Sequence, residues 1–170
     1  MRLDFASLFR EHYPRIYRYV RYRVDDDVVA EDLTAEIFER AYRSLETYNP
    51  KLSSFTTWLT QIAHNWVNNY LIREARHAKH EYMAGEEMEQ LASREATLEA
   101  QVIQDEIMRR LLECLELLSE RDRQIVSLRF TLDTRNKEIA EMLGIKEHTI
   151  SVVLLRAVQR LRECHQGEAV

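Results

Sequence analysis

The stretch NKEIAEMLGIKEHTISVVLLRAVQRLRE, residues 136–163, decides how this chain is interpreted. Ile139, Ala140 and Leu143 fall on one face of a first helix, and Gly144 follows its end, where a positive φ is favoured. A second, longer helix carries apolar side chains at helical spacing, namely Ile150, Val153, Leu154, Ala157 and Leu161. This pattern predicts a helix-turn-helix, whose second helix usually enters the DNA major groove. An ordinary helical hairpin is the alternative at this point.

The composition predicts a chain that is nearly all helical. Its 170 residues include only 3 Gly and 2 Pro, and no alternating β-branched runs. A hydrophobic content of 45% supports packed cores. The longest aliphatic run, Val152–Leu155, is far shorter than a membrane span, and the N-terminus lacks a signal-peptide core. We therefore expect a cytoplasmic protein without direct membrane insertion.

The two cysteines, Cys114 and Cys164, are far apart in the sequence and form no metal-ligand pattern. In a cytoplasmic protein they are expected to be reduced, structural thiols. No metal or other cofactor is expected.

The net charge of −5 is concentrated in one segment. Residues 81–106 carry a net charge of −7, whereas residues 1–80 and 107–170 each carry +1. Any DNA binding must therefore come from local patches and not from a basic domain.

Three helices are expected before the acidic segment, at residues 4–23, 28–45 and 55–76. Pro14 should kink the first helix or mark its restart. The acids at 25–27 should cap the second helix, because carboxylates accept free backbone N–H groups there and a calcium loop would need further ligands.

The third expected helix combines aromatic residues with three Asn and a Gln. Amides beside aromatic rings suit contact with unstacked bases, although core packing is the better interpretation of each aromatic residue taken singly. His64 is expected to be a surface residue or a nucleic-acid contact and not a catalyst.

The remainder of the chain reads as a linker at 80–103 and a four-helix unit at 104–165. Ser119 and Asp122 resemble a capping box at the start of one of these helices. At the start of the helix-turn-helix, Arg135 stands where a Ser or Thr cap is common, so Thr134 or Asp133 is expected to cap instead.

The complete order resembles the extracytoplasmic-function (ECF) group of bacterial sigma factors in the sigma-70 family. The resemblance covers nearly the whole chain and is carried by YPRIYRY (13–19), AEDLTAEIFERAY (30–42), FTTWLTQIAHNWVNNYLIR (55–73), LSERDRQIVSLRF (118–130), NKEIAEMLGIKEHTI (136–150) and RAVQRLRE (156–163). Each motif is weakly specific alone, but together in this order they are strongly specific.

The resemblance implies an all-α fold of two small helical domains, 1–79 and 104–165, joined by the acidic linker. It implies binding to the core RNA polymerase, at the β′ clamp helices and the β flap, and recognition and melting of promoter DNA. The implied polymerase-binding residues are Asp32, Leu33, Glu36, Phe38 and Arg40. The implied minus-ten and melting residues are Lys51, Ser53, Ser54, Trp58, His64, Asn65, Asn69, Arg73 and Arg76. The implied minus-thirty-five residues are Arg135, Lys146, Glu147, His148, Thr149, Ser151, Val152 and Arg156.

Two departures from the family pattern qualify these roles. Ala35 stands where the family often has Gln, and Ser151 and Val153 stand where many members have Lys or Arg. Val152 and Leu155 would then be apolar on or near the DNA side, where they meet thymine methyl groups or the helix of a regulator. An anti-sigma factor is accordingly an expected partner.

Two other functional classes compete with a sigma factor. A free-standing helix-turn-helix regulator would bind DNA alone and would not need the outer face of residues 28–45. An enzyme is not indicated, because the sequence has no Ser-His-Asp set, phosphate-binding Gly loop or metal cluster.

Overall fold

The computed structural model describes residues 4–84 and 99–167, and within these ranges the chain is helical without any strand. This confirms the predicted all-α class. The elements are α1 (Phe5–Arg21), α2 (Asp27–Arg43), the 3-10 turn η1 (Leu45–Thr47), α3 (Phe55–Ala84), α4 (Glu99–Glu116), α5 (Glu120–Phe130), α6 (Asn136–Leu143) and α7 (Glu147–Gln166).

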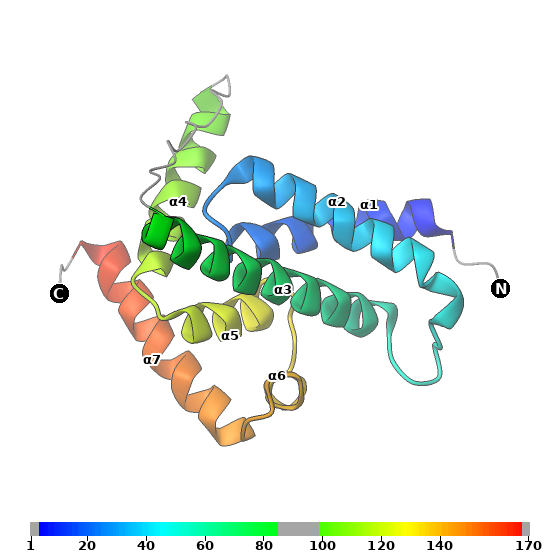
Figure 1. The fold of residues 1–170 in the computed structure, drawn as a ribbon. Helices are drawn as coiled ribbons and strands as arrows, with labels where there is room; N and C mark the ends of the chain where they lie inside the picture. Colours follow the sequence, from blue (N-terminus) through cyan, green and yellow to red (C-terminus); the bar gives the residue numbers. More distant parts are fainter. Residues whose placement is uncertain (1–3, 85–98, 168–170) are drawn as a thin grey trace.

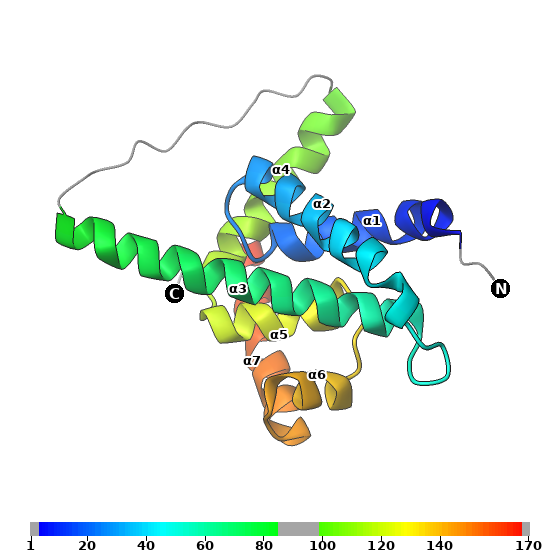
Figure 2. The same cartoon turned by 45° about the vertical axis from the view of Figure 1, so that its right-hand side comes forward.

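Helix α3 runs across the middle of the molecule (Figures 1 and 2). Helices α1 and α2 lie on one side of it, and α5, α6 and α7 lie on the other. We refer to α1–α3 as the N-terminal half and to α4–α7 as the C-terminal half.

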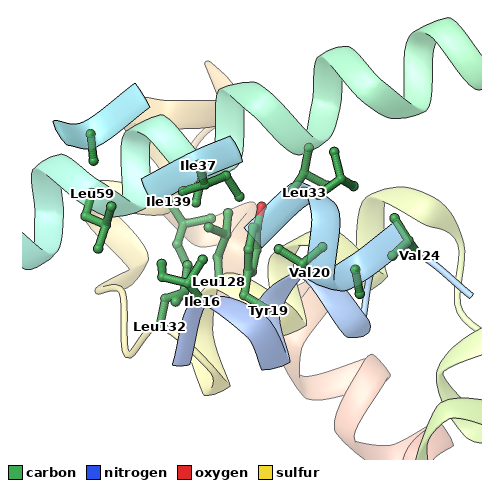
Figure 3. Packing of buried hydrophobic residues seen from close by; sticks show 14 of the residues in the cluster. Ile16, Tyr19, Val20, Val24, Leu33, Ile37, Leu59, Leu128, Leu132 and Ile139 are labelled. Carbon is green, nitrogen blue, oxygen red and sulfur yellow. The ribbon is translucent and has the colours of Figure 1, made fainter. Parts of the chain in front are cut away.

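The largest apolar core is shared by the two halves. Ile16 and Tyr19 of α1 are 2% and 0% exposed, and they belong to one cluster with Leu128, Leu132 and Ile139 of the C-terminal half. Figure 3 shows these side chains gathered between the helices. The two parts that the sequence divides at an acidic linker therefore pack against each other in this structure.

Local capping follows the sequence at three helix ends. The Asp26 carboxylate accepts a hydrogen bond from the Val29 backbone N–H at 2.9 Å, and the Ser119 hydroxyl accepts one from Asp122 at 3.2 Å. Gly144 ends α6 with φ 65°, the left-handed conformation that glycine adopts without a Cβ penalty. The caps predicted at Asp26 and Gly144 are confirmed, and Ser119 is confirmed as the N-cap of α5, which is one half of the predicted capping box.

The predicted cap of α6 is wrong. Arg135 is the N-cap residue, and its backbone N–H donates to the Glu138 carboxylate at 3.1 Å. Thr134 is buried and Asp133 pairs with Arg129, so neither side chain is available to cap. Glu138 thus supplies the acid half of a capping box, in which the side chain at the third helical position accepts from the backbone N–H of the N-cap residue.

Several helix limits differ from those expected. Helix α3 continues past Arg76 to Ala84, and α4 begins at Glu99, so both enter the segment 80–103 expected to be a linker. The part of that segment at 85–98 lies outside the described residues. Helix α1 is unbroken at Pro14. Of the described helices, none is long and apolar enough to cross a membrane.

The prediction of two reduced thiols is also wrong. Cys114 of α4 and Cys164 of α7 form a disulfide, with 5.8 Å between their Cα atoms. A separation of 50 residues gave no indication of this pairing. The two cysteines meet only because α4 and α7 pack side by side.

Candidate nucleic-acid interface

The outer face of α2 carries three of the five side chains expected to bind a protein partner. Asp32, Glu36 and Arg40 follow each other at intervals of four residues and are all exposed. Leu33 and Phe38 are 4% and 2% exposed, so they are core residues and not surface contacts. The apolar stripe of an amphipathic helix turns inward, which corrects their assignment to the binding face.

A groove runs between α2 and α3. Its larger hollow has a volume of about 760 Å³ and a second hollow has about 340 Å³; Glu36 and Arg73 line both. The larger hollow is also lined by Glu39, Arg40, Arg43, Ser44, Ile62, Asn65, Trp66 and Asn69. The α2–α3 groove therefore joins the expected polymerase-binding face to the amide-bearing face of α3, which the sequence presented as separate sites.

Trp66 lies in this groove and was not among the predicted site residues. Its indole Nε1–H donates a hydrogen bond to the Glu36 carboxylate at 2.6 Å. The guanidinium groups of Arg40 and Arg73 lie 3.3 and 5.4 Å from the centre of a Trp66 ring. The sequence favours core packing for each aromatic residue of this helix, and the residue type alone gives no sign of these contacts.

The exposed amides and cations of α3 lie along the same side as the groove. Asn65 and Asn69 are exposed and line the larger hollow, with the Gln61 amide donating to Asn65 at 3.2 Å. Arg73 and Arg76 are exposed farther along the helix. Amides are the kind of side chain that hydrogen-bonds base edges, and cations the kind that contacts phosphates, so the chemistry of this surface suits both.

The loop before α3 contributes a second group of expected contacts. Lys51 and Ser54 are exposed and Ser53 is half-buried. The Ser54 hydroxyl accepts a hydrogen bond from the Thr57 backbone N–H at 3.1 Å, which caps the start of α3. Trp58 is half-buried, and its ring packs on those of Tyr48 and Phe55, with centroids 5.2 and 5.5 Å away.

His64 does not lie at the surface as predicted. It is 4% exposed, and its Nε2 is 3.1 Å from the Asn68 amide nitrogen. Its Nδ1 faces the Gln124 amide of α5 at 3.5 Å. Burial, with a further contribution from the positive charge of Arg23, lowers the pKa of His64 to about 4. The neutral ring therefore belongs to the junction between the two halves.

This junction is organised by Arg23, a residue that the sequence did not single out. Arg23 is 3% exposed and donates to the Glu120 carboxylate at 3.0 and 2.5 Å, to the Asn68 amide oxygen at 3.0 Å and to the Tyr19 hydroxyl at 3.1 Å. Gln124 also donates to Asn68 at 3.0 Å. A buried guanidinium is stable only with such hydrogen-bond partners. We refer to the network of Arg23, Tyr19, Asn68, Glu120 and Gln124 as the Arg23 junction.

Burial of neutral His64 predicts that acid destabilises the fold. The unfolded chain takes up a proton near the ordinary pKa of 6.5, whereas the folded chain does so near 4. The unfolded state therefore binds more protons between these values, and stability falls as the pH falls through this window. We expect the free energy of unfolding to drop by roughly 2 to 3 kcal/mol between about pH 7 and pH 4.5.

Urea denaturation at a series of pH values measures this drop. A His64→Gln variant, which keeps a neutral polar side chain, should lose most of the slope. The remainder is expected from His12, whose pKa burial also lowers. A wild-type profile that stays flat across the window would show that His64 is not held neutral in the folded protein.

The helix-turn-helix presents most of its expected DNA contacts to solvent. Side chains are exposed at six of the eight positions and half-buried at Thr149 and Val152. The exposed six are Arg135, Lys146, Glu147, His148, Ser151 and Arg156. Leu155 of α7 is 73% exposed, an unusual position for a large apolar side chain.

The two halves also meet at the loop before α3. Ser54 and Arg135, which come from different expected DNA-binding sets, line one hollow of about 360 Å³. One residue expected to contact the minus-ten element and one expected to contact the minus-thirty-five element therefore line the same hollow.

Comparison with known proteins identifies relatives for both halves. Residues 8–77 match the family described as "Sigma-70 region 2", and residues 108–161 match "Sigma-70, region 4". The chain is similar to the ECF RNA polymerase sigma factor BldN of Streptomyces coelicolor, with 31% identity covering 92% of this chain and 58% of BldN. It is also similar to the RNA polymerase sigma factor CarQ of Myxococcus xanthus, with 30% identity covering 94% of this chain and 87% of CarQ.

A solved structure shares the fold. The sigma factor RpoE of Bartonella quintana, in complex with the anti-sigma factor NepR, matches with a TM-score of 0.75 at 21% identity. The match covers 96% of this chain and 97% of that one.

Proposed function

The chain belongs to the ECF group of the sigma-70 family, and on that premise we propose that it binds core RNA polymerase, directs it to specific promoters and promotes DNA melting. The observation that carries this proposal is the α2–α3 groove. There the exposed acids of α2 adjoin the exposed amides and arginines of α3, so a protein partner and a DNA strand would be held side by side.

In this proposal the N-terminal part, residues 1–79, contacts the polymerase and the minus-ten element. Asp32, Glu36 and Arg40 face the β′ clamp helices, and they are exposed on one side of α2. Asn65 and Asn69 contact unstacked bases of the non-template strand, and Arg73 and Arg76 contact phosphates. Capture of unstacked bases shifts the equilibrium toward open DNA without any chemical step, which is the action of an initiation factor and not of an enzyme.

The C-terminal part, residues 104–165, is proposed to recognise the minus-thirty-five element and to meet the β flap. The acidic linker at 80–103 would run through the polymerase cleft between the two DNA-binding parts of the chain. Ser151 and Val153 of α7 stand where cations are common in the family. We therefore expect the C-terminal half to anchor the protein upstream and to contribute less to base discrimination than α3 does. An anti-sigma factor is a proposed partner of the exposed Leu155. A cytoplasmic location follows from the proposed partners, polymerase and promoter DNA.

The N-terminal and C-terminal halves, which pack against each other in this structure, must separate if both promoter elements are bound at once. The two elements are separated by about 25 base pairs, or about 85 Å of DNA at about 3.4 Å per base pair. Ser54 belongs to the proposed minus-ten contacts and Arg135 to the proposed minus-thirty-five contacts, yet they line the same hollow. The Arg23 junction is therefore a contact that promoter binding has to break.

Weakening the Arg23 junction should open the free protein. A Glu120→Lys variant would place a cation against buried Arg23, so the halves should separate. We expect the radius of gyration, measured by small-angle scattering, to rise from about 15 Å for a compact chain to about 20 Å. A Glu141→Lys variant, with the same charge change on the exposed side of α6, should stay compact. An unchanged radius in Glu120→Lys would contradict the role of this junction.

Reconstituted transcription tests the proposed function. The protein is mixed with purified bacterial core polymerase, and co-elution and selective initiation from candidate promoters are measured. We expect a stable complex and initiation that depends on the protein. Binding of promoter DNA by the isolated protein, without co-elution or initiation, would indicate a free-standing regulator and would refute the proposal.

A further inference from the structure

Trp66 makes two unlike contacts with one short stretch of α2. Its single hydrogen-bond donor is directed at the Glu36 carboxylate, 2.6 Å away and 30 residues earlier in the chain. One of its rings lies against the Arg40 guanidinium, 3.3 Å from the ring centre. Glu36 and Arg40 are one helical turn apart and exposed, so both side chains would otherwise rotate freely in solvent.

The Trp66 side chain has a fixed position from which it can restrict the motion of neighbouring side chains. It is half-buried and packs against the main apolar core, so its own position is set by that packing. A rigid aromatic ring anchored in this way can restrict longer side chains without losing much freedom of its own. It thus contacts one acidic and one basic side chain, Glu36 and Arg40, that are both exposed on α2.

We propose that Trp66 is a positioning residue for polymerase binding, which orients Glu36 and Arg40 before the partner arrives. This inference rests on the proposed function of the α2 face. A side chain that is already ordered loses less conformational entropy on binding, so the complex is tighter without a direct contact from Trp66. The residue lies on α3, which otherwise carries the proposed DNA contacts, and therefore connects the two surfaces.

Two substitutions separate the hydrogen bond from the ring. Trp66→Phe keeps an aromatic face and removes the N–H group, so mainly Glu36 is released. Trp66→Leu removes both and releases Arg40 as well. We expect the Kd for core polymerase to rise about 3- to 10-fold for Trp66→Phe and about 10- to 30-fold for Trp66→Leu, from the ordering cost of one and two long side chains.

A double-mutant cycle distinguishes positioning from a general structural effect. In a Glu36→Ala background the hydrogen bond no longer exists, so Trp66→Phe should weaken binding further by less than about 2-fold. A merely structural role would give the same loss in both backgrounds. Ile72→Ala, at an exposed apolar residue of the same helix, is the matched control and should bind like the wild type. Thermal unfolding of each variant checks that the fold is retained.

The outcomes are distinct. Wild-type affinity of Trp66→Phe, or an equal loss in the Glu36→Ala background, would overturn the positioning role while the proposed function stands. Failure of the wild-type protein to bind core polymerase would instead refute the proposed function. Loss of binding in Trp66→Phe that disappears in the Glu36→Ala background supports the inference.

Discussion

The variant that carries both Asp32→Arg and Glu36→Arg is expected to lose binding to core polymerase. Both carboxylates are exposed on one side of α2 and line the smaller hollow of the α2–α3 groove. Reversing two charges in a docked interface replaces attraction with repulsion. Removing one partner of a close interfacial charge pair already costs about 2–5 kcal/mol, so we expect affinity to fall at least about 100-fold.

Fluorescence anisotropy with labelled protein and purified core polymerase measures this loss. A matched control is the variant with Glu11→Arg and Glu46→Arg, which makes the same change in net charge at exposed acids outside α2. The control should retain affinity, and both proteins should unfold at nearly the same urea concentration because exposed substitutions change stability little. Normal binding by the α2 variant would mean that this face is not the polymerase contact.

Removing the disulfide is expected to have the largest effect on stability. The bond between Cys114 and Cys164 closes a loop that contains α5, α6 and most of α7, with a separation of 50 residues. Such a loop restricts the unfolded chain by about 4 kcal/mol in the chain-entropy account. We therefore expect Cys114→Ala with Cys164→Ala to lower the free energy of unfolding by about 4 kcal/mol.

Urea denaturation with and without dithiothreitol checks this value. Reductant should destabilise the wild-type protein by a similar amount and leave the double alanine variant unchanged, which separates loss of the bond from loss of side-chain packing. If reductant has no effect on the wild-type protein, the disulfide does not contribute to its stability in solution.

Three predictions of helix ends that depend on neighbouring residues were confirmed. Asp26, Ser119 and Gly144 act at helix ends through groups no more than four residues away, so their roles follow from local backbone geometry. The same reasoning failed at Thr134, because its side chain is buried by packing that the local sequence does not contain.

The candidate site was predicted in part. The exposed positions of Asp32, Glu36 and Arg40 follow from helical periodicity, and Leu33 lies at a buried position of the same helix. Including Leu33 and Phe38 in the binding face followed the family resemblance and not this pattern, and the structure corrects it. Site roles of the exposed side chains stay predictions until the variants are measured.

Spacing along the chain was enough to predict the helical class, the order of the helices, the helix-turn-helix and the family, because each depends on the positions of residue types. Three contacts became visible only in the folded chain: Trp66 with Glu36, Arg23 with Glu120 across the two halves, and the bond between the two cysteines. These partners are 30, 97 and 50 residues apart. Their contacts depend on how helices pack in space, and the periodicity of a single helix determines which face is apolar but not which helix that face will meet.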